Sequence, residues 1–149
     1  MKTIPLIGRI FFSLLFLSAV MGHFSRGGID YAASMGVPMA GFLVPLSGVI
    51  AAAGALSILA GYKAKAGAWL IILFLIPVTF MMHKFWAVTD PMMMQMQLSM
   101  FMKNIALTGG ALMIAYFGAG PYSIDARIAS KKKPANFIKK EEQAWKQAS

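Results

Sequence analysis

The chain contains no cysteine and very few acidic residues. Without cysteine it forms no disulfide, has no thiolate nucleophile and holds no zinc or iron–sulfur site through sulfur. Only five aspartates and glutamates occur in 149 residues, and two of them, Glu141 and Glu142, lie near the C-terminus. No Ser-His-Asp set, phosphate-binding glycine loop or pair of carboxylates on one helical face is evident. A hydrolase or a phosphoryl-transfer enzyme is therefore poorly supported.

Charge of either sign is scarce, and apolar residues are abundant. Charged residues make up 13% of the chain, against about 25% in soluble domains. Hydrophobic residues make up 58%, and the mean hydropathy is +0.67. A single soluble core of this size does not hide so much apolar surface, so the composition predicts an integral membrane protein.

Four mainly apolar segments are long enough to cross a bilayer, which takes about twenty residues. The expected spans cover residues 4–22, 39–62, 66–82 and 98–117. A cleaved signal peptide is an alternative for the first segment, but Arg9 interrupts its apolar run. The sequence thus predicts an all-α bundle of four transmembrane helices, formed by a domain of residues 1–128.

Basic residues predict the orientation of this bundle, because they are enriched in cytoplasmic loops. They gather on one side of the predicted spans, at Lys2, Lys63, Lys65 and the residues from Arg127 onward. We therefore expect both termini and the 62–65 loop to be cytoplasmic, and residues 22–38 and 83–97 to face outward.

The C-terminal tail, residues 129–149, is strongly basic. Of the fourteen lysines and arginines in the chain, seven fall between Arg127 and Lys146. Residues 134–149 fit an interfacial helix, and a solvated disordered tail is the alternative. Because no nucleic-acid motif accompanies the charge, we expect anionic lipid head groups as partners and no nucleic acid.

Small residues predict how the helices pack, since close helix contacts in a membrane depend on them. The second span carries pairs with small-xxx-small spacing, among them Gly48 with Ala52, and the fourth span carries Gly109 and Gly110. We expect the second helix at the centre of the bundle, near the fourth.

Several short motifs occur in order along the chain: Met35-Gly36-Val37-Pro38, Gly61-Tyr62, His83, Phe101-Met102-Lys103-Asn104, Gly109-Gly110, and the run from Gly118 to Asp125. Together they resemble the DoxX family of small, four-helix proteins of the bacterial inner membrane, over about residues 5–128. The resemblance implies an association with membrane redox chemistry. Some relatives are subunits of a quinone-reducing thiosulfate oxidoreductase, and others partner enzymes of oxidative-stress defence.

The chain departs from the family pattern at two positions. The family often has a lysine after the glycine that ends the first span, where this chain has Gly22-His23. It often has a glutamate in the second span, where this chain has Ala51. The missing glutamate argues against a catalytic cycle of the chain's own.

Polar residues near the outer ends of the spans are the candidate ligand-binding residues: His23, His83, Trp86, Lys103 and Asn104. Charged groups inside a span are costly and are candidates for function. Imidazole binds quinone carbonyls or metals, and the Lys-Asn pair suits an anionic or quinoid oxygen. The alternative is that the histidines cap helices or face water, while Lys103 extends to the interface or pairs with Asp90.

Two further groups have simpler interpretations. Met92, Met96 and Met100 form a thioether stripe that suits Cu(I), but no second ligand set accompanies it, so we expect no metal site. On the inner side, we expect Arg9 to pair with Asp125, and Ser123 or Asp125 to cap a short surface helix.

These observations leave three hypotheses for a bacterial inner-membrane protein that has other membrane or redox proteins as partners. The first is a non-catalytic subunit or scaffold of a membrane redox complex. The second is a quinone-linked oxidoreductase component with an outward-facing polar pocket. The third is a small-molecule transporter, which four helices accommodate least well.

Overall fold

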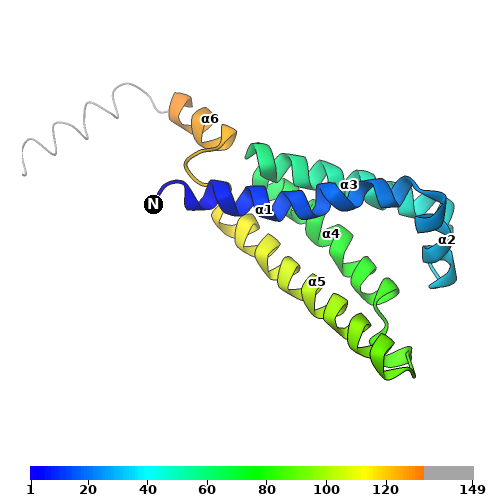
Figure 1. Cartoon of the computed structure of the whole chain (residues 1–149). Helices are drawn as coiled ribbons and strands as arrows, with labels where there is room; N and C mark the ends of the chain where they lie inside the picture. Colours follow the sequence, from blue (N-terminus) through cyan, green and yellow to red (C-terminus); the bar gives the residue numbers. More distant parts are fainter. Residues whose placement is uncertain (133–149) are drawn as a thin grey trace, which may run out of the picture.

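The computed structural model describes residues 1–132, and this part of the chain is helical, without β-strands (Figure 1). In chain order the elements are α1 (Ile4–Ala19), η1 (Val20–Phe24), α2 (Arg26–Ser34), α3 (Ala40–Ala60), α4 (Ala64–Met82), η2 (Phe85–Ala87), α5 (Pro91–Phe117) and α6 (Ile124–Lys132). The tail from residue 133 onward, including the predicted interfacial helix in residues 134–149, lies outside the described residues.

Four helical segments are long and apolar enough to cross a membrane: α1 with η1, α3, α4 with η2, and α5. This confirms the predicted all-α class with four transmembrane helices. The start of α1 and α6 lie at one end of the molecule, whereas α2 and the α4–α5 connection lie at the other (Figure 1). We call these the α6 end and the α2 end. Which of the two is cytoplasmic stays a prediction, as does the domain boundary after residue 128.

Two helical stretches lie where the sequence suggested loops. Helix α5 begins at Pro91, seven residues before the expected start, because an Asp90 carboxylate oxygen accepts the Met93 backbone N–H at 2.8 Å. Helix α2 is capped in the same way by Ser25, whose Oγ accepts the Gly28 N–H at 3.0 Å. Both caps satisfy backbone donors that a helix N-terminus leaves unpaired.

Helices α3 and α4 pack closely against each other at two glycines. A Cβ on Gly54 would lie 2.8 Å from the Gly67 carbonyl oxygen, and a Cβ on Gly67 would lie 2.6 Å from the Ser57 hydroxyl. The buried core follows this contact and contains Ala55, Ile71 and other apolar residues of α3 and α4. Small residues therefore place α3 centrally, as the sequence predicted.

The expected contact between the second and fourth spans is wrong. Helix α5 packs along α4, and α3 packs against α1 and α4 instead. The glycines of α5 do not pack against α3. Gly110 faces the ring of Phe12 on α1, and a Cβ added to Gly109 would meet nothing within 4 Å in residues 1–132 beyond its chain neighbours and the local backbone of its own helix. At the α2 end, α5 diverges from α1 (Figure 1).

At the α6 end, the segment after α5 is tied to the α3–α4 turn. The Asp125 carboxylate accepts the N–H groups of Lys63 at 2.8 Å and Ala64 at 3.0 Å, which caps α4. Ser123 Oγ accepts the Ala126 N–H at 3.1 Å, which confirms it as a cap of α6. The expected Arg9–Asp125 salt bridge is wrong: the guanidinium of Arg9 donates to the carbonyl of Tyr122, while both carboxylate oxygens of Asp125 accept backbone N–H groups at the start of α4.

Candidate functional site: a histidine-lined cavity

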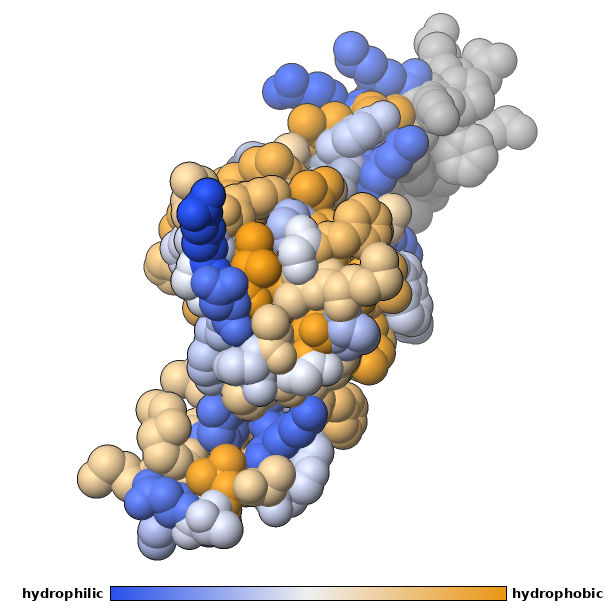
Figure 2. Space-filling view, turned by 90° about the vertical axis from the view of Figure 1, so that its right-hand side faces the viewer, coloured by the Kyte–Doolittle hydropathy of each residue, from blue (hydrophilic) through white to orange (hydrophobic). Residues whose placement is uncertain are grey.

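A cavity of about 530 Å³ lies at the α2 end between η1, α2, α3 and α4. Its volume falls within the range of about 300–1,000 Å³ that is usual for small-molecule sites. Among the described residues that line it, the polar side chains are His23, Ser47 and His83, and the others are apolar or glycine. We call it the His23–His83 cavity. Figure 2 looks onto this end, where hydrophilic and hydrophobic residues alternate over the surface.

His23 is held by the short 3-10 turn that extends α1. Its Nδ1 lies 3.1 Å from the Ala19 carbonyl oxygen. A carbonyl only accepts, so Nδ1 carries the proton and Nε2 of the neutral ring is an acceptor. The ring packs at a tilt against Phe74, with centroids 5.5 Å apart. The imidazole is thus fixed both in orientation and in tautomer.

Gly48 on α3 makes room for this histidine. A Cβ at position 48 would lie 2.7 Å from His23 Cβ, closer than real Cβ contacts come, and 3.2 Å from His23 Cγ. Glycine therefore lets η1 lie directly on α3, and this close approach positions His23 at the cavity. The small-residue pattern of the second span shapes the cavity here as well as the helix packing.

His83 ends α4 and is held by a residue that the sequence analysis missed. Its Nδ1 lies 2.9 Å from Gln97 Oε1, and Gln97 is buried on α5 with 6% of its surface exposed. With Oε1 as the acceptor, His83 is protonated on Nδ1 and its Nε2 is an acceptor. The sequence predicts that the fourth span starts at residue 98, so it does not reveal that Gln97 lies on a buried face of α5.

Two further acceptors belong to residues that line the cavity. The Ser47 hydroxyl donates its proton to the Val44 carbonyl at 2.7 Å, which leaves its lone pairs available. Pro77 has no N–H, so the carbonyl of Leu73, four residues earlier, lacks its helical partner. Leu73 and Pro77 both line the cavity. A ligand with hydroxyl donors matches this set better than a ligand with acceptors alone.

Three of the predicted site residues do not line the cavity. Lys103 is exposed, and its Nζ lies 3.4 Å from the Met100 sulfur. Trp86 packs edge-on against Phe85 and Phe101 and is largely exposed. Asn104 is buried on α5. The structure thus brings His23 and His83 together and places Trp86, Lys103 and Asn104 elsewhere.

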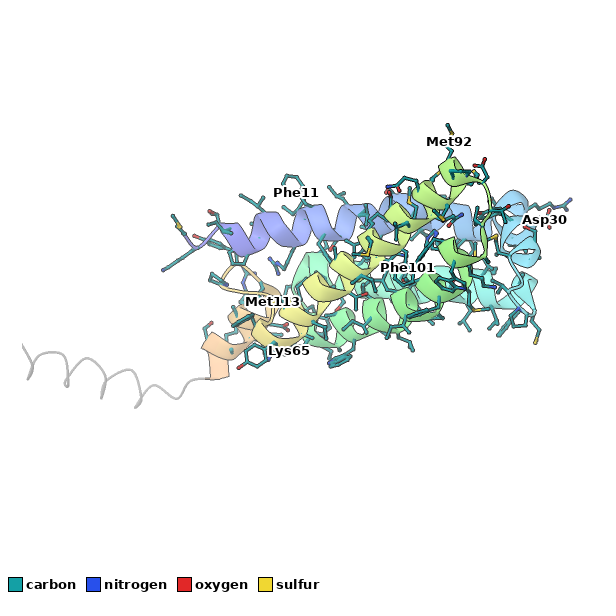
Figure 3. The ribbon with its side chains drawn as sticks, turned by 90° about the horizontal axis from the view of Figure 1, so that it is seen from below. Phe11, Asp30, Lys65, Met92, Phe101 and Met113 are labelled. Atoms are coloured by element: carbon teal, nitrogen blue, oxygen red, sulfur yellow. The ribbon has the colours of Figure 1, made fainter. Side chains whose placement is uncertain are left out.

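Within residues 1–132 there is no group of three or more His, Cys, Asp or Glu side chains arranged to hold a metal ion. The methionines of the α5 stripe are exposed on the helix, with Met92 the most exposed of them (Figure 3).

Four membrane-length helices with short connections, and a cavity at one end of them, define a small helical membrane protein. The DoxX family model matches residues 4–84, which is more than half of the chain. The chain therefore belongs to the DoxX family, and it is a multi-pass inner membrane protein.

Two Escherichia coli (strain K12) proteins are similar over most of their length. The chain is 35% identical to inner membrane protein YqjF over 129 residues, which covers 85% of this chain and 92% of YqjF. It is 29% identical to inner membrane protein YphA over 126 residues, which covers 82% of this chain and 88% of YphA. No solved structure matches the chain.

Proposed function

We propose that this protein is a non-catalytic subunit of a membrane redox complex and holds a molecule of the quinone class in the His23–His83 cavity. The observation that supports this most directly is the cavity itself, which is apolar except for polar groups that accept hydrogen bonds. Such a lining suits a hydroquinone ring with an isoprenoid chain, since the hydroxyls donate and the chain lies along apolar walls.

The histidines would bind and orient the head group. In the neutral state, Nε2 of each imidazole would accept a hydrogen bond from a ligand hydroxyl, and Ser47 or the Leu73 carbonyl would accept one from any further donor. The bound quinone or hydroquinone would supply the redox chemistry itself. The chain has no cysteine, and Ala51 stands where relatives often have a glutamate, so we assign electron transfer to partner subunits.

Purification of the full chain from its native membranes in a mild detergent tests this proposal. We expect a stable complex with at least one other membrane or redox protein, together with a quinone that lipid extraction and mass spectrometry identify. An unrelated inner-membrane protein carrying the same affinity tag is the control. Recovery of this chain alone, with no more quinone than the control, would contradict the proposed function.

A further inference from the structure

A second cavity, of about 510 Å³, lies at the α6 end, away from the histidines. Its walls come from the end of α3, the turn before α6 and one side of α6, and include Ala60, Tyr122, Ser123, Arg127 and Ser130. We call it the Arg127 pocket. Unlike the His23–His83 cavity, the part of its lining that comes from residues 1–132 is mixed, with one cation, hydroxyl groups and apolar residues.

A buried cation lies directly behind one wall of this pocket. Arg9 is 3% exposed and donates from Nη2 to the carbonyl of Tyr122, a lining residue. Its Nε and Nη1 are buried and have no hydrogen-bond partner within residues 1–132. Asp125, whose charge also acts on Arg9, accepts two backbone N–H groups of the α3–α4 turn and forms no hydrogen bond with the guanidinium. A buried, incompletely paired guanidinium is costly, and a nearby anion offsets part of that cost.

The solvent-exposed side chains of α6 indicate the source of such an anion. Ile124 and Ile128 are 43% and 39% exposed, and Arg127 and Lys131 flank them at helical spacing. An exposed apolar pair between basic residues is the pattern of a helix that lies in a membrane interface. Because α6 begins only seven residues after the last span ends, we expect it to lie near the lipid head groups.

We propose that the Arg127 pocket binds the phosphate group of an anionic phospholipid. Arg127 contacts the phosphate, and the buried charge of Arg9 adds positive potential from behind the wall. Ile124 and Ile128 lie among the first carbons of the acyl chains. The site is independent of the quinone-class ligand and lies at the opposite end of the molecule.

Native mass spectrometry of the full-length protein in detergent micelles tests the assignment. The protein is titrated with phosphatidylglycerol or with phosphatidylcholine of identical acyl chains. We expect the first phosphatidylglycerol to bind at least about fivefold more tightly, and Arg127→Gln to remove about fivefold in its affinity, the effect of one basic residue at a membrane surface. Arg127 is exposed, so its replacement leaves the fold intact.

Two matched variants separate a defined pocket from a diffuse basic surface. Lys65→Gln removes an exposed charge at the same end, and Arg26→Gln removes one at the α2 end. We expect each to change phosphatidylglycerol affinity less than twofold. The proposal would be overturned if Arg127→Gln and Lys65→Gln lost the same affinity for phosphatidylglycerol. It would also be overturned if phosphatidylglycerol and phosphatidylcholine bound equally well. If millimolar inorganic phosphate displaced phosphatidylglycerol, the proposal would also be overturned, because the pocket would then bind a soluble anion instead of a lipid.

Discussion

Replacing both His23 and His83 with leucine should weaken binding of a hydroquinone by about 100-fold. Each substitution leaves one ligand hydroxyl without its acceptor in an apolar cavity, and an unmade buried hydrogen bond costs about 1–3 kcal/mol. Leucine keeps the apolar walls and a similar volume, so the loss reports the hydrogen bonds. The affinity is measured with decylhydroquinone on the purified protein in nanodiscs.

Matched variants outside the cavity provide the control. Trp86→Leu and Lys103→Gln alter two residues that the sequence placed in the same site and the structure places elsewhere. We expect both to bind decylhydroquinone with wild-type affinity, and each single histidine variant to lose about tenfold, the effect of one such hydrogen bond. Wild-type affinity in the double variant, or a large loss in Lys103→Gln with none in the histidine variants, would reject the cavity as the ligand site.

Gly61→Ala should destabilise the protein by about 3 kcal/mol, the sum of left-handed backbone strain and overpacking. Gly61 ends α3 with φ +65°, a conformation that alanine adopts only with strain. A Cβ there would collide with the guanidinium of Arg9 and lie 2.5 Å from Ser123 Cβ. The change therefore affects the point where α1 and the turn before α6 meet the end of α3. The free energy of unfolding in detergent is the measurement.

Gly109→Ala is the comparison for this variant. Gly109 lies within α5, and the described part of the chain places nothing within 4 Å of an added Cβ. Alanine there should leave stability unchanged or raise it by up to about 1 kcal/mol, because alanine favours a helix more than glycine does. If both variants unfold at the same denaturant concentration, the packing of Arg9 on Gly61 does not stabilise the fold.

The transmembrane helices could be predicted from the sequence because long, mainly apolar segments are what a helix surrounded by lipid requires. The same runs placed His23 and His83 at the end of the first and third spans, and the two side chains do meet at one cavity. Successive spans cross the membrane in opposite directions. The first and third spans therefore end on the same side of the bilayer, at a similar depth.

The details that the sequence did not predict depend on contacts between distant segments. From the sequence, Gln97 is expected in a polar loop. In the structure α5 starts earlier, at the Asp90 cap, so Gln97 lies within the helix and its side chain contacts His83. The sequence offers Asp125 as a partner for Arg9, but in the structure Arg9 donates to the backbone carbonyl of Tyr122. Local pattern does not reveal which of several acceptors a folded turn brings nearest.

The His23–His83 cavity is expected to lie in the outer half of the membrane, opposite the basic α6 end, and the proposed function depends on that placement. Lys65 and Met92 are exposed and mark the two ends (Figure 3). Because the chain has no cysteine, Lys65→Cys and Met92→Cys each create a single reporter thiol. With a membrane-impermeant maleimide on intact cells, we expect Met92→Cys to react and Lys65→Cys to react only after permeabilisation. Reaction of both from the same side, or of Lys65→Cys alone from outside, would contradict the account.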